Sequence, residues 1–488
     1  MSAASRLPVR VPASPRLGLT AANLLPLGLG LLFFAVSTGF AALQHLTFHT
    51  RARDMGIYIQ ALWSAAQGRP FLSSLFQENT NHLAEHVAPS LWPLVPLAGL
   101  APDAVPLVVL QQLFLAACGI PLYLVARGRL GRWPGMAVLL GFYLMPAVSR
   151  VSLSEFHPIV LAALPVAAAV ACALARWPRS AALLLLFALL FEEEAAPTVA
   201  GLGAMLGLRL LPLPAGSRNL GATLVAVAAL WLALTAFVVM PGFRLRLPAG
   251  RGEATNRAVS HYDQVRQNPA VVWGWLTAER GPDALAWLLL PNGGLALLAP
   301  QVLAIDLPGF AALFLQDRAG TYAGHWSAPL LPVVWLAVAV GLGRLTRRPL
   351  LLRGGLALLL GGLALAYSLD SSFPGGRQYE PDHFQTTELE ADLRRAVNLV
   401  PPQASLAATR RVVPQLAARR ELYQYPFSFY DPPLRPDAQR PDVYILDLTD
   451  SPTRRVVEAG ETDSLLQKGP GYDVQRFGPN VLLLTRNR

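Results

Sequence analysis

Residues 21–43 read AANLLPLGLGLLFFAVSTGFAAL. This stretch carries no charged side chain, and a helix of about 20 apolar residues is long enough to cross a hydrocarbon core of about 30 Å. It exceeds the apolar length of about 7–15 residues usual in a signal peptide, and no small-residue cleavage site follows it. The stretch therefore predicts a first membrane helix, and further apolar runs follow it along the chain.

The composition of the whole chain fits the same class. Of its 488 residues, 53% are hydrophobic and only 14% are charged, whereas a soluble domain carries about 25% charged residues. The net charge of +10 could suggest nucleic-acid binding, but Lys468 is the only lysine, and no basic patch with interleaved aromatic residues occurs. Cys118 and Cys172 both lie in apolar runs and indicate no disulfide framework. We therefore expect the lipid bilayer as a partner, and no nucleic acid.

The distribution of arginine predicts how the chain is threaded. Arginines occupy short loops between apolar runs, which is the positive-inside pattern, and these loops divide the chain into about eleven membrane segments. We expect a cytoplasmic tail at residues 1–20, and a helical transmembrane domain at 21–369 with external loops at 45–100 and 242–283. The hairpin expected at 284–316 has no charge at its turn, so its topology stays open.

Residues 370–488 have a different composition and predict a small extracytoplasmic α/β domain. Thr387-Glu-Leu-Glu390 forms a capping box that opens an amphipathic helix, which ends before Pro401. We expect a short helix at 412–419, and short strands at 405–409, 421–425, 443–448, 472–477 and 481–485. The fold class is therefore a multi-pass α-helical membrane protein with a small C-terminal extracytoplasmic α/β domain.

Acidic and histidine side chains gather on one predicted side of this membrane domain. Such groups are costly at membrane depth, where they commonly face a cavity and mark a functional path. We expect them to converge on one polar cavity open to the outside, although solvated loops also collect polar residues. The set comprises Asp54, His82, Glu85, His86, Glu155, His157, Glu192, Glu193, Glu194, His261, Tyr262, Asp263 and His325.

Two members of this set have plain structural alternatives. Asp54 lies in the segment 53–63, a predicted amphipathic helix on the outer membrane surface with Ile57, Ala61 and Leu62 on its apolar face. A carboxylate at that position could serve only as an N-terminal helix charge. The three adjacent acids 192–194 cannot all face one way, and a solvated hairpin tip is the alternative to a binding role.

The segment His82-Leu-Ala-Glu85-His86 matches the H-x-x-E-H pattern of a class of zinc proteases. In that chemistry two histidines bind Zn²⁺ and the glutamate activates water, and Glu155 would supply the third ligand. The pattern is frequent by chance, however, and Pro89 follows at once, so a long helix is not assured. A divalent metal held for another purpose, or direct binding of a polar substrate by these residues, are the alternatives.

Several segments, taken in order, resemble an uncharacterised membrane family known as domain of unknown function 2079. The resemblance covers nearly the whole chain, and Glu85 and the extra acids beside Glu193 are local departures from its pattern. The matching segments are Asp54–Trp63, His82–Pro89, Glu155–Pro158, Phe191–Ala195, Tyr322–Pro329, Val413–Arg419 and Val443–Asp447.

The layout of that family is similar to the GT-C glycosyltransferases, which use polyprenyl-phosphate sugars. The resemblance implies an inverting enzyme at the outer face of a bacterial plasma membrane, with Asp54 as general base for an envelope acceptor. It implies a departing lipid phosphate stabilised by His86, His157 or His325. A transporter, or a non-catalytic envelope protein that binds lipid or glycan, are the competing interpretations. The residues implied in substrate or phosphate binding are His82, Glu85, His86, Glu155, His157, Glu193 and His325.

Overall fold

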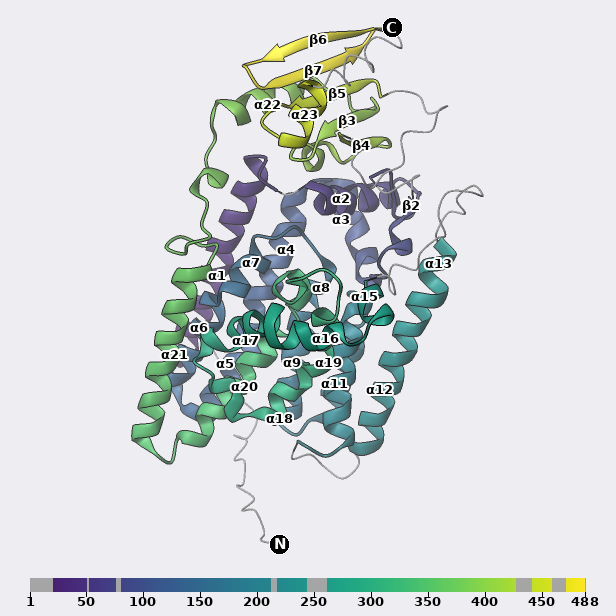
Figure 1. The fold of residues 1–488 in the computed structure, drawn as a ribbon. Helices are drawn as coiled ribbons and strands as arrows, with labels where there is room; N and C mark the ends of the chain where they lie inside the picture. The colour runs from purple at the N-terminus through teal and green to yellow at the C-terminus, as the bar shows by residue number, and fades with distance from the viewer. Residues whose placement is uncertain are drawn as a thin grey trace.

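Helices form the body of the molecule, and a small sheet lies at one end of it (Figure 1). The computed structural model describes residues 21–50, 52–75, 80–211, 217–243, 261–426, 441–458 and 471–487. Its α-helices are α1 (Ala21–Leu46), α2 (Ala52–Ala66), α3 (Val95–Leu100), α4 (Ala104–Ala117), α5 (Gly119–Leu130), α6 (Arg132–Leu144), α7 (Pro146–Ser152), α8 (Pro158–Leu161), α9 (Ala163–Leu174), α10 (Pro178–Ala188), α11 (Ala196–Gly207), α12 (Ser217–Leu234), α13 (Met240–Phe243), α15 (Asp263–Gln267), α16 (Val271–Gly274), α17 (Gly281–Leu289), α18 (Pro300–Leu303), α19 (Leu307–Phe314), α20 (Leu331–Leu345), α21 (Pro349–Asp370), α22 (Glu388–Asn398) and α23 (Ser451–Glu458).

Four helical segments of the described chain are long and apolar enough to cross a membrane, or five if the bent pair at 132–152 is one span. The four are 24–46, 104–130, 217–243 and 349–370, and the bent pair turns by 49° at Pro146. Shorter apolar helices occupy 158–174, 178–188, 300–314 and 331–345. Such short or broken helices are tolerated at membrane depth where other helices enclose them. The count of about eleven spans stays a prediction.

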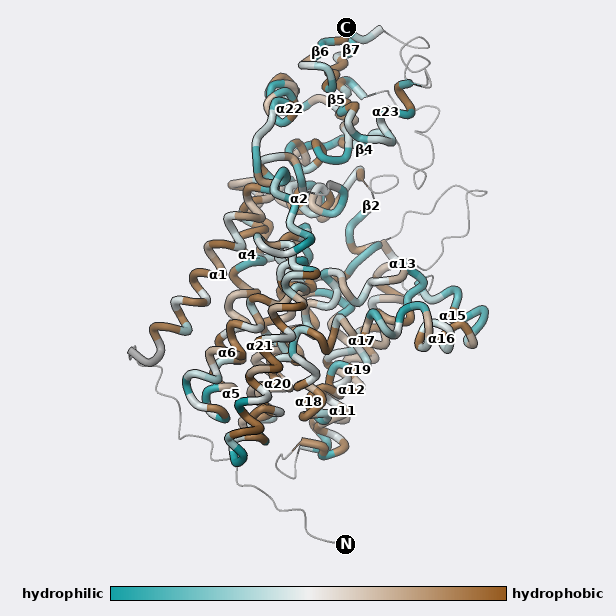
Figure 2. Tube along the Cα trace, turned by 60° about the vertical axis from the view of Figure 1, so that its left-hand side comes forward, coloured by the Kyte–Doolittle hydropathy of each residue, from teal (hydrophilic) through white to brown (hydrophobic). Residues whose placement is uncertain are grey.

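The outer helices and the central helix bury their apolar side chains differently. Leucines of α1, α12 and α21 stay uncovered, with Leu31 58%, Leu230 68% and Leu350 78% exposed. By contrast, residues 331–342 of α20 are buried without interruption. Figure 2 shows hydrophobic colour along the long helices and more hydrophilic colour around α15, α22 and β4. Large exposed apolar surface on the outer helices indicates contact with lipid, so the helical part is a membrane domain.

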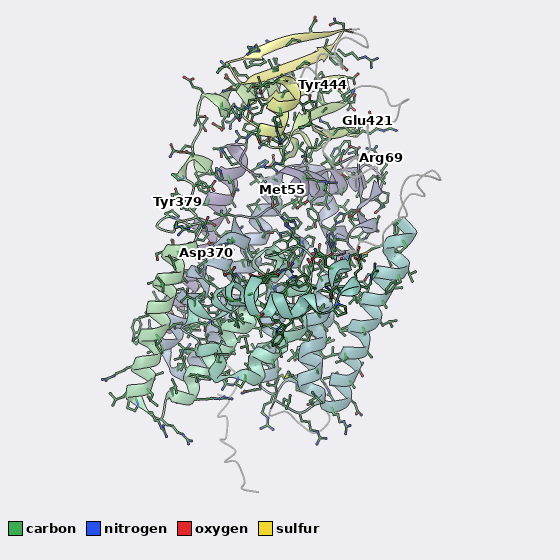
Figure 3. All side chains as sticks on the ribbon, in the orientation of Figure 1. Met55, Arg69, Asp370, Tyr379, Glu421 and Tyr444 are labelled. Carbon is green, nitrogen blue, oxygen red and sulfur yellow. The ribbon has the colours of Figure 1, made fainter. Side chains whose placement is uncertain are left out.

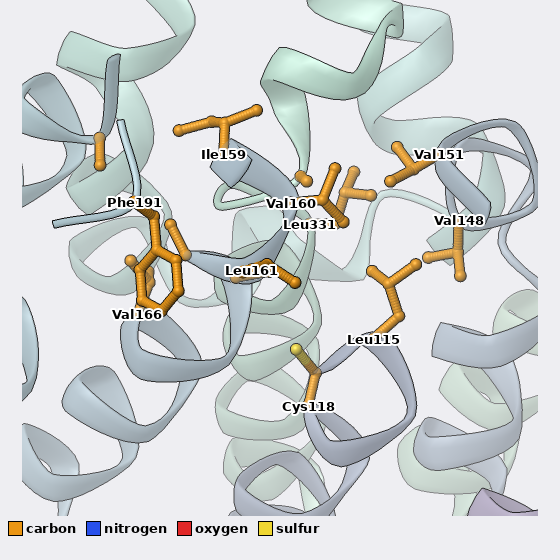
Figure 4. Packing of buried hydrophobic residues seen from close by; sticks show 14 of the residues in the cluster. Leu115, Cys118, Val148, Val151, Ile159, Val160, Leu161, Val166, Phe191 and Leu331 are labelled. Carbon is orange, nitrogen blue, oxygen red and sulfur yellow. The ribbon is translucent and has the colours of Figure 1, made fainter. Parts of the chain in front are cut away.

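Close packing around α20 fixes the middle of the membrane domain. Leu115 and Cys118 at the end of α4 meet Val148, Ile159 and Leu331 of other helices in one buried cluster (Figure 4). The central helix also packs tightly against α6, where a Cβ added at Gly141 would clash with the Trp335 ring. Because interiors packed this tightly leave little freedom, the segments that carry polar residues at the end of this bundle are held in fixed positions.

The C-terminal part is an α/β domain around a five-stranded sheet. Its strands are β3 (Leu406–Thr409), β4 (Leu422–Tyr425), β5 (Val443–Asp447), β6 (Tyr472–Phe477) and β7 (Val481–Arg486). The order is β4-β3-β5-β7-β6, with β3 parallel to β4 and β5, and β7 antiparallel to β5 and β6. All five predicted strands are present, and the Thr387–Glu390 capping box opens α22 as expected. The short helix expected at 412–419 is a 3₁₀ turn, η12 (Val413–Leu416).

Helix α2 joins the two parts of the molecule. It lies directly below the C-terminal domain in Figure 1 and packs against η12. The contact is close enough that a Cβ added at Gly56 would lie 2.7 Å from Val413 Cγ1. The predicted helix at 53–63 is confirmed, and its expected apolar face is buried at Ile57, Ala61 and Leu62. The extended pair β1 (Leu72–Ser73) and β2 (Thr80–Asn81) follows it.

Candidate functional site

Asp54, in the first turn of α2, lies beside two stacked histidines. Its Oδ2 is 3.6 Å from Nε2 of His157, which is ion-pair distance when the imidazole is protonated. The ring of His157 lies parallel to that of His325, with centroids 3.3 Å apart and 12° between the planes. The His325 ring in turn contacts Trp326, with centroids 4.0 Å apart. Residues from three distant parts of the sequence therefore meet at one carboxylate.

Two buried glutamines of α4 hold the segment that carries His157. Gln111 Oε1 accepts from the backbone N–H of His157 at 3.0 Å, and its Nε2 donates to the Val151 carbonyl at 3.2 Å. Gln112 and Ser152 exchange two hydrogen bonds of 2.6 and 2.7 Å. The Nδ1 of His157 donates to the Glu155 carbonyl at 2.9 Å. This last bond orients the ring so that Nε2 faces Asp54.

The acids after α10 form a second group beside the first. Glu193 Oε1 is 2.9 Å from His86 Nδ1, and its Oε2 accepts from the Val87 backbone N–H at 2.8 Å. Glu192 Oε1 accepts from the Tyr58 hydroxyl at 3.4 Å and lies 3.8 Å from His86 Nδ1. Glu192 and Glu193 are both buried. These acids are therefore internal partners of a histidine, and the solvated hairpin tip considered from the sequence is wrong for these two.

Tyr58 links the two groups. It lies one turn after Asp54 on α2, and its buried ring meets His157 and His82 edge-on, with centroids 5.7 and 4.9 Å away. Because its hydroxyl bonds Glu192, the phenol spans the space between the Asp54 side and the Glu193 side. We call Asp54, Tyr58, His86, His157, Glu192, Glu193 and His325 the acid–imidazole cluster.

The surroundings set which members of the cluster carry charge. The Asp54 side chain is 52% exposed; the dense protein around it favours a neutral carboxyl, but the His157 imidazole and the charges of Arg53 and His86 hold its pKa below the usual value. Burial would lower the pKa of His157, yet its contact with Asp54 raises it. Burial also opposes charge on His86, and Glu192 and Glu193 outweigh it, so its pKa lies well above the usual range. The cluster therefore holds an ionised aspartate beside protonated imidazoles.

Burial shifts the pKa values of the remaining histidine and of the remaining glutamates in opposite directions. Burial, followed by the charges of His157 and His86, lowers the pKa of His325 well below the usual value. Of the stacked pair, His157 is therefore the ring that bears positive charge more readily, and His325 is neutral. Burial raises the pKa of Glu192 to about 7 and that of Glu194 to about 8, against the opposing effect of His86. One acid of the 192–194 triplet is thus neutral near pH 7.

The H-x-x-E-H segment does not have the geometry of a zinc protease. Residues His82–Ala84 form only a 3₁₀ turn, with Glu85 at its C-terminal cap. The rings of His82 and His86 lie 6.1 Å apart and are tilted by 44°, and His86 is bound to Glu193 instead. Within the described ranges, no group of three or more histidine, cysteine, aspartate or glutamate side chains is arranged to hold a metal ion. The residues His82, His86 and Glu155 therefore do not fit a metal centre.

Most of the predicted site residues are brought together. Asp54, His86, His157, Glu193 and His325 belong to the cluster, and His82 packs on Tyr58 at its edge. Glu155 contributes its carbonyl to His157 and its charge to the environment of that ring. Glu85 is half-buried on the adjoining turn.

Four polar residues that matter here were not predicted from the sequence. Tyr58 lies inside the Asp54–Trp63 segment that carries the family resemblance, but nothing in the sequence distinguishes it from an ordinary core residue. Gln111 and Gln112 are amides inside an apolar run, which is a signal that could have been used. Asp306 is buried in the turn between α18 and α19, and its two carboxylate oxygens contact no hydrogen-bond donor in the part of the chain that the structure describes.

The fold and the cluster define a membrane protein with an ionised carboxylate and protonated imidazoles where its helical domain meets an α/β domain. The profile of the family described as "Predicted membrane protein (DUF2079)" matches residues 44–482, and the chain belongs to that family. A comparison with curated proteins finds no match.

Among solved structures, the chain is similar to ArnT from Cupriavidus metallidurans, crystallised bound to undecaprenyl phosphate. The two share 12% sequence identity with a TM-score of 0.51, over 96% of this chain and 98% of that chain. At this identity the likeness establishes the fold, and it confirms the GT-C-like layout expected from the sequence.

Proposed function

We propose that this chain is a glycosyltransferase that moves a sugar from a polyprenyl-phosphate donor to a hydroxyl of an envelope acceptor. The observation that carries the proposal is the contact of Asp54 with His157, itself stacked on His325. An ionised carboxylate can accept a proton, and adjacent imidazolium groups can stabilise developing negative charge. Transfer of a sugar from a phosphate leaving group needs both.

In the proposed reaction Asp54 accepts the proton of the acceptor hydroxyl as that oxygen attacks the anomeric carbon. The bond between the anomeric carbon and the phosphate oxygen breaks, and the electron pair leaves with the lipid phosphate. Attack from the face opposite the leaving group inverts the anomeric configuration. His157 and His86 are the cations available to the departing phosphate, because their neighbouring carboxylates keep them protonated.

Two features support a lipid-linked donor. The outer helices α1, α12 and α21 leave large leucine side chains exposed, as a surface in contact with lipid does. The structural neighbour was crystallised with undecaprenyl phosphate, a molecule of the proposed donor class. The fold alone does not specify activity, so the assignment depends on the cluster.

The proposed orientation places the cluster and the C-terminal domain at the outer face of a bacterial plasma membrane. In this arrangement residues 1–20 are cytoplasmic, segments 45–100 and 242–283 are external, and residues 370–488 form the extracytoplasmic domain. The excess of arginine in the remaining short loops supports it. Cysteine-accessibility labelling at a loop on each side would test this orientation.

The test of the proposed activity is the Asp54→Asn variant, which keeps the shape of the side chain and removes the base. Sugar transfer is measured in membranes that contain radiolabelled polyprenyl-phosphate sugar, with protein abundance checked in the same samples. Asp382→Asn, an exposed aspartate on the linker before α22, is the matched control. Loss of transfer in Asp54→Asn alone supports the proposal. Full transfer by Asp54→Asn at normal abundance would reject Asp54 as the base.

A transporter is the second candidate, and Asp306 is the observation that favours it. An acid buried inside an apolar segment without a described donor is the type of group found on ion and proton paths. Uptake into vesicles that contain the purified protein tests this reading. Transport that depends on Asp306 and survives Asp54→Asn would favour the transporter over the transferase.

A further inference from the structure

A cavity of about 140 Å³ lies at the junction of α2 with the C-terminal domain. Its wall on one side is Gln60, Trp63 and Ser64 of α2, continued by Arg69, and on the other side Arg419 and Arg420. Figure 3 shows Arg69 and Glu421 at this junction, below Tyr444 of the sheet and away from the membrane helices. Three arginines thus surround one small space outside the acid–imidazole cluster.

The most buried of these arginines is held in place by backbone carbonyls. Arg419 is only 4% exposed, its Nε donates to the Leu416 carbonyl at 2.7 Å, and its Nη1 donates to the Ala404 carbonyl at 3.0 Å. Burial lowers the pKa of this guanidinium to about 10, which still leaves it charged at neutral pH. The two carbonyls fix the position of the guanidinium group and leave its positive charge in place.

None of the three arginines forms an ion pair with a described carboxylate, although Glu421 lies at the same junction. The arginine ion pairs among the residues that the structure describes involve Arg150, Arg266, Arg395 and Arg411. Arg69 instead lies over the Trp63 ring, at 5.4 Å from its centroid. Of the three, Arg419 is buried, Arg69 is half-buried and Arg420 is exposed. Because a buried charge without a counter-ion is unfavourable, an anion that entered this cavity would gain most from the charge of Arg419.

The volume of the cavity and the residues that line it restrict which anions can bind there. Planar guanidinium groups match the oxygens of phosphate and carboxylate in a two-point geometry. Gln60 and Ser64 add polar surface and Trp63 adds an aromatic face, a combination suited to a sugar ring that bears the acidic group. A volume of about 140 Å³ suits one such unit and is too small for a whole oligosaccharide.

We propose that this cavity binds the phosphate or carboxylate of an acidic sugar unit, and that it anchors an anionic acceptor glycan for transfer at Asp54. The second part depends on the proposed function, whereas the binding itself does not. Trp63 follows Asp54 by nine positions on one helix, which corresponds to about 14 Å at 1.5 Å per residue. An acceptor chain held at one end of α2 can therefore reach the carboxylate at the other end.

The binding test uses full-length protein in lipid nanodiscs and saturation-transfer NMR. The probes are glucuronate, glucose 1-phosphate and glucose, so the two acidic groups and the neutral sugar are compared directly. The variant Arg69→Gln/Arg420→Gln removes two cavity charges, and Arg410→Gln/Arg476→Gln removes two exposed charges elsewhere in the C-terminal domain. Arg419 is left intact, because its buried hydrogen bonds make it a risk for folding.

We expect an acidic probe to bind the wild type and the control variant equally, and to bind the cavity variant at least about tenfold more weakly. Preference for one acid over the other identifies the group that the site recognises. Binding of neutral glucose as strong as that of both acids, or equal weakening in both variants, would overturn the site.

A second measurement separates this inference from the proposed activity. If the chain transfers sugar, the cavity variant should raise KM for an acidic acceptor with kcat unchanged, because anchoring adds binding energy without touching the reacting atoms. If no transfer is found at all, specific binding of the acidic probe still stands and only the acceptor role falls. If the cavity variant is active and its KM is unchanged, the acceptor-anchoring role of the cavity is rejected, and the proposed glycosyltransferase activity still stands.

Discussion

The two ends of helix α2 have opposite electrostatic character. At its start Asp54 and Tyr58 face acids and histidines of the membrane domain, and about two turns later Trp63 and Ser64 face arginines near the C-terminal domain. The first end holds charges in matched pairs at short distance. The second end holds cations with no described counter-ion. The paired end suits the proton transfer that we propose, and the unpaired end suits the anion binding that we propose.

Gln60 stands between the two ends and ties them together. Its buried amide accepts from Ser73 Oγ at 2.7 Å and from the Ser74 backbone N–H at 2.9 Å, and it donates to the Arg419 carbonyl at 2.9 Å. One side chain thus fixes α2, the segment after it and the C-terminal domain. The helix of 15 residues is therefore held in place between the two proposed sites.

The largest expected effect is on the rate of sugar transfer, and it distinguishes the two ends of α2. Asp54→Asn should lower the rate of sugar transfer by about 100-fold or more, because general-base catalysis contributes at least that factor. Binding of glucuronate or glucose 1-phosphate to the same variant, measured by saturation-transfer NMR, should not change. Loss of both readouts would mean that the ends act as one site, and the comparison would fail.

The next effect concerns Gln60, which lies between the two ends of α2. Gln60→Leu should lower the free energy of unfolding by about 2 kcal/mol or more, because it leaves buried donors and acceptors of three segments without partners. Thermal unfolding of the purified protein in nanodiscs measures this. Gln67→Leu, on the exposed turn after α2, is the control and should be close to neutral. A stable Gln60→Leu protein would show that the C-terminal domain is held mainly by other contacts.

A smaller effect should appear in the pH dependence of transfer. His157 contributes to the low pKa of Asp54, so the carboxylate stays ionised down to a pH below its usual range. In His157→Gln that pKa rises, and the loss of activity on acidification should begin at a higher pH than in the wild type. A rate profile that extends from pH 8 down to about pH 3 tests this. An unshifted acidic limb would show that His157 does not set the charge of Asp54.

The last effect concerns stability at alkaline pH. Burial raises the pKa of Glu194 to about 8, so the folded state binds a proton that the unfolded state has already lost above about pH 5. Stability from this group is therefore present in acid and falls as pH rises toward 8. Glu194→Gln should melt like the wild type at pH 5 and at a higher temperature at pH 9. Equal melting temperatures at both values would contradict a neutral Glu194 in the folded state.

The sequence predicted elements well where a local pattern carried the information. The segment 53–63 became α2, the Thr387–Glu390 capping box opened α22, and the five strands of the C-terminal domain were each found near their expected positions. It also predicted that Asp54, His157 and His325 belong together, because acids and histidines are rare and costly in such surroundings. The zinc-protease alternative considered for the H-x-x-E-H segment does not hold, since its first residues form a 3₁₀ turn and His86 pairs with Glu193.

The sequence by itself determined that this is a membrane protein, because apolar runs of that length have no stable place in water. It also determined which residue types would need partners. Only the tertiary structure decided who the partners are: Glu193 bonds His86 across 107 positions, and Gln60 reaches Arg419 across 359. Hydrophobic burial depends on composition and periodicity, which are local, whereas a hydrogen bond or an ion pair depends on distances of a few ångströms that packing alone sets.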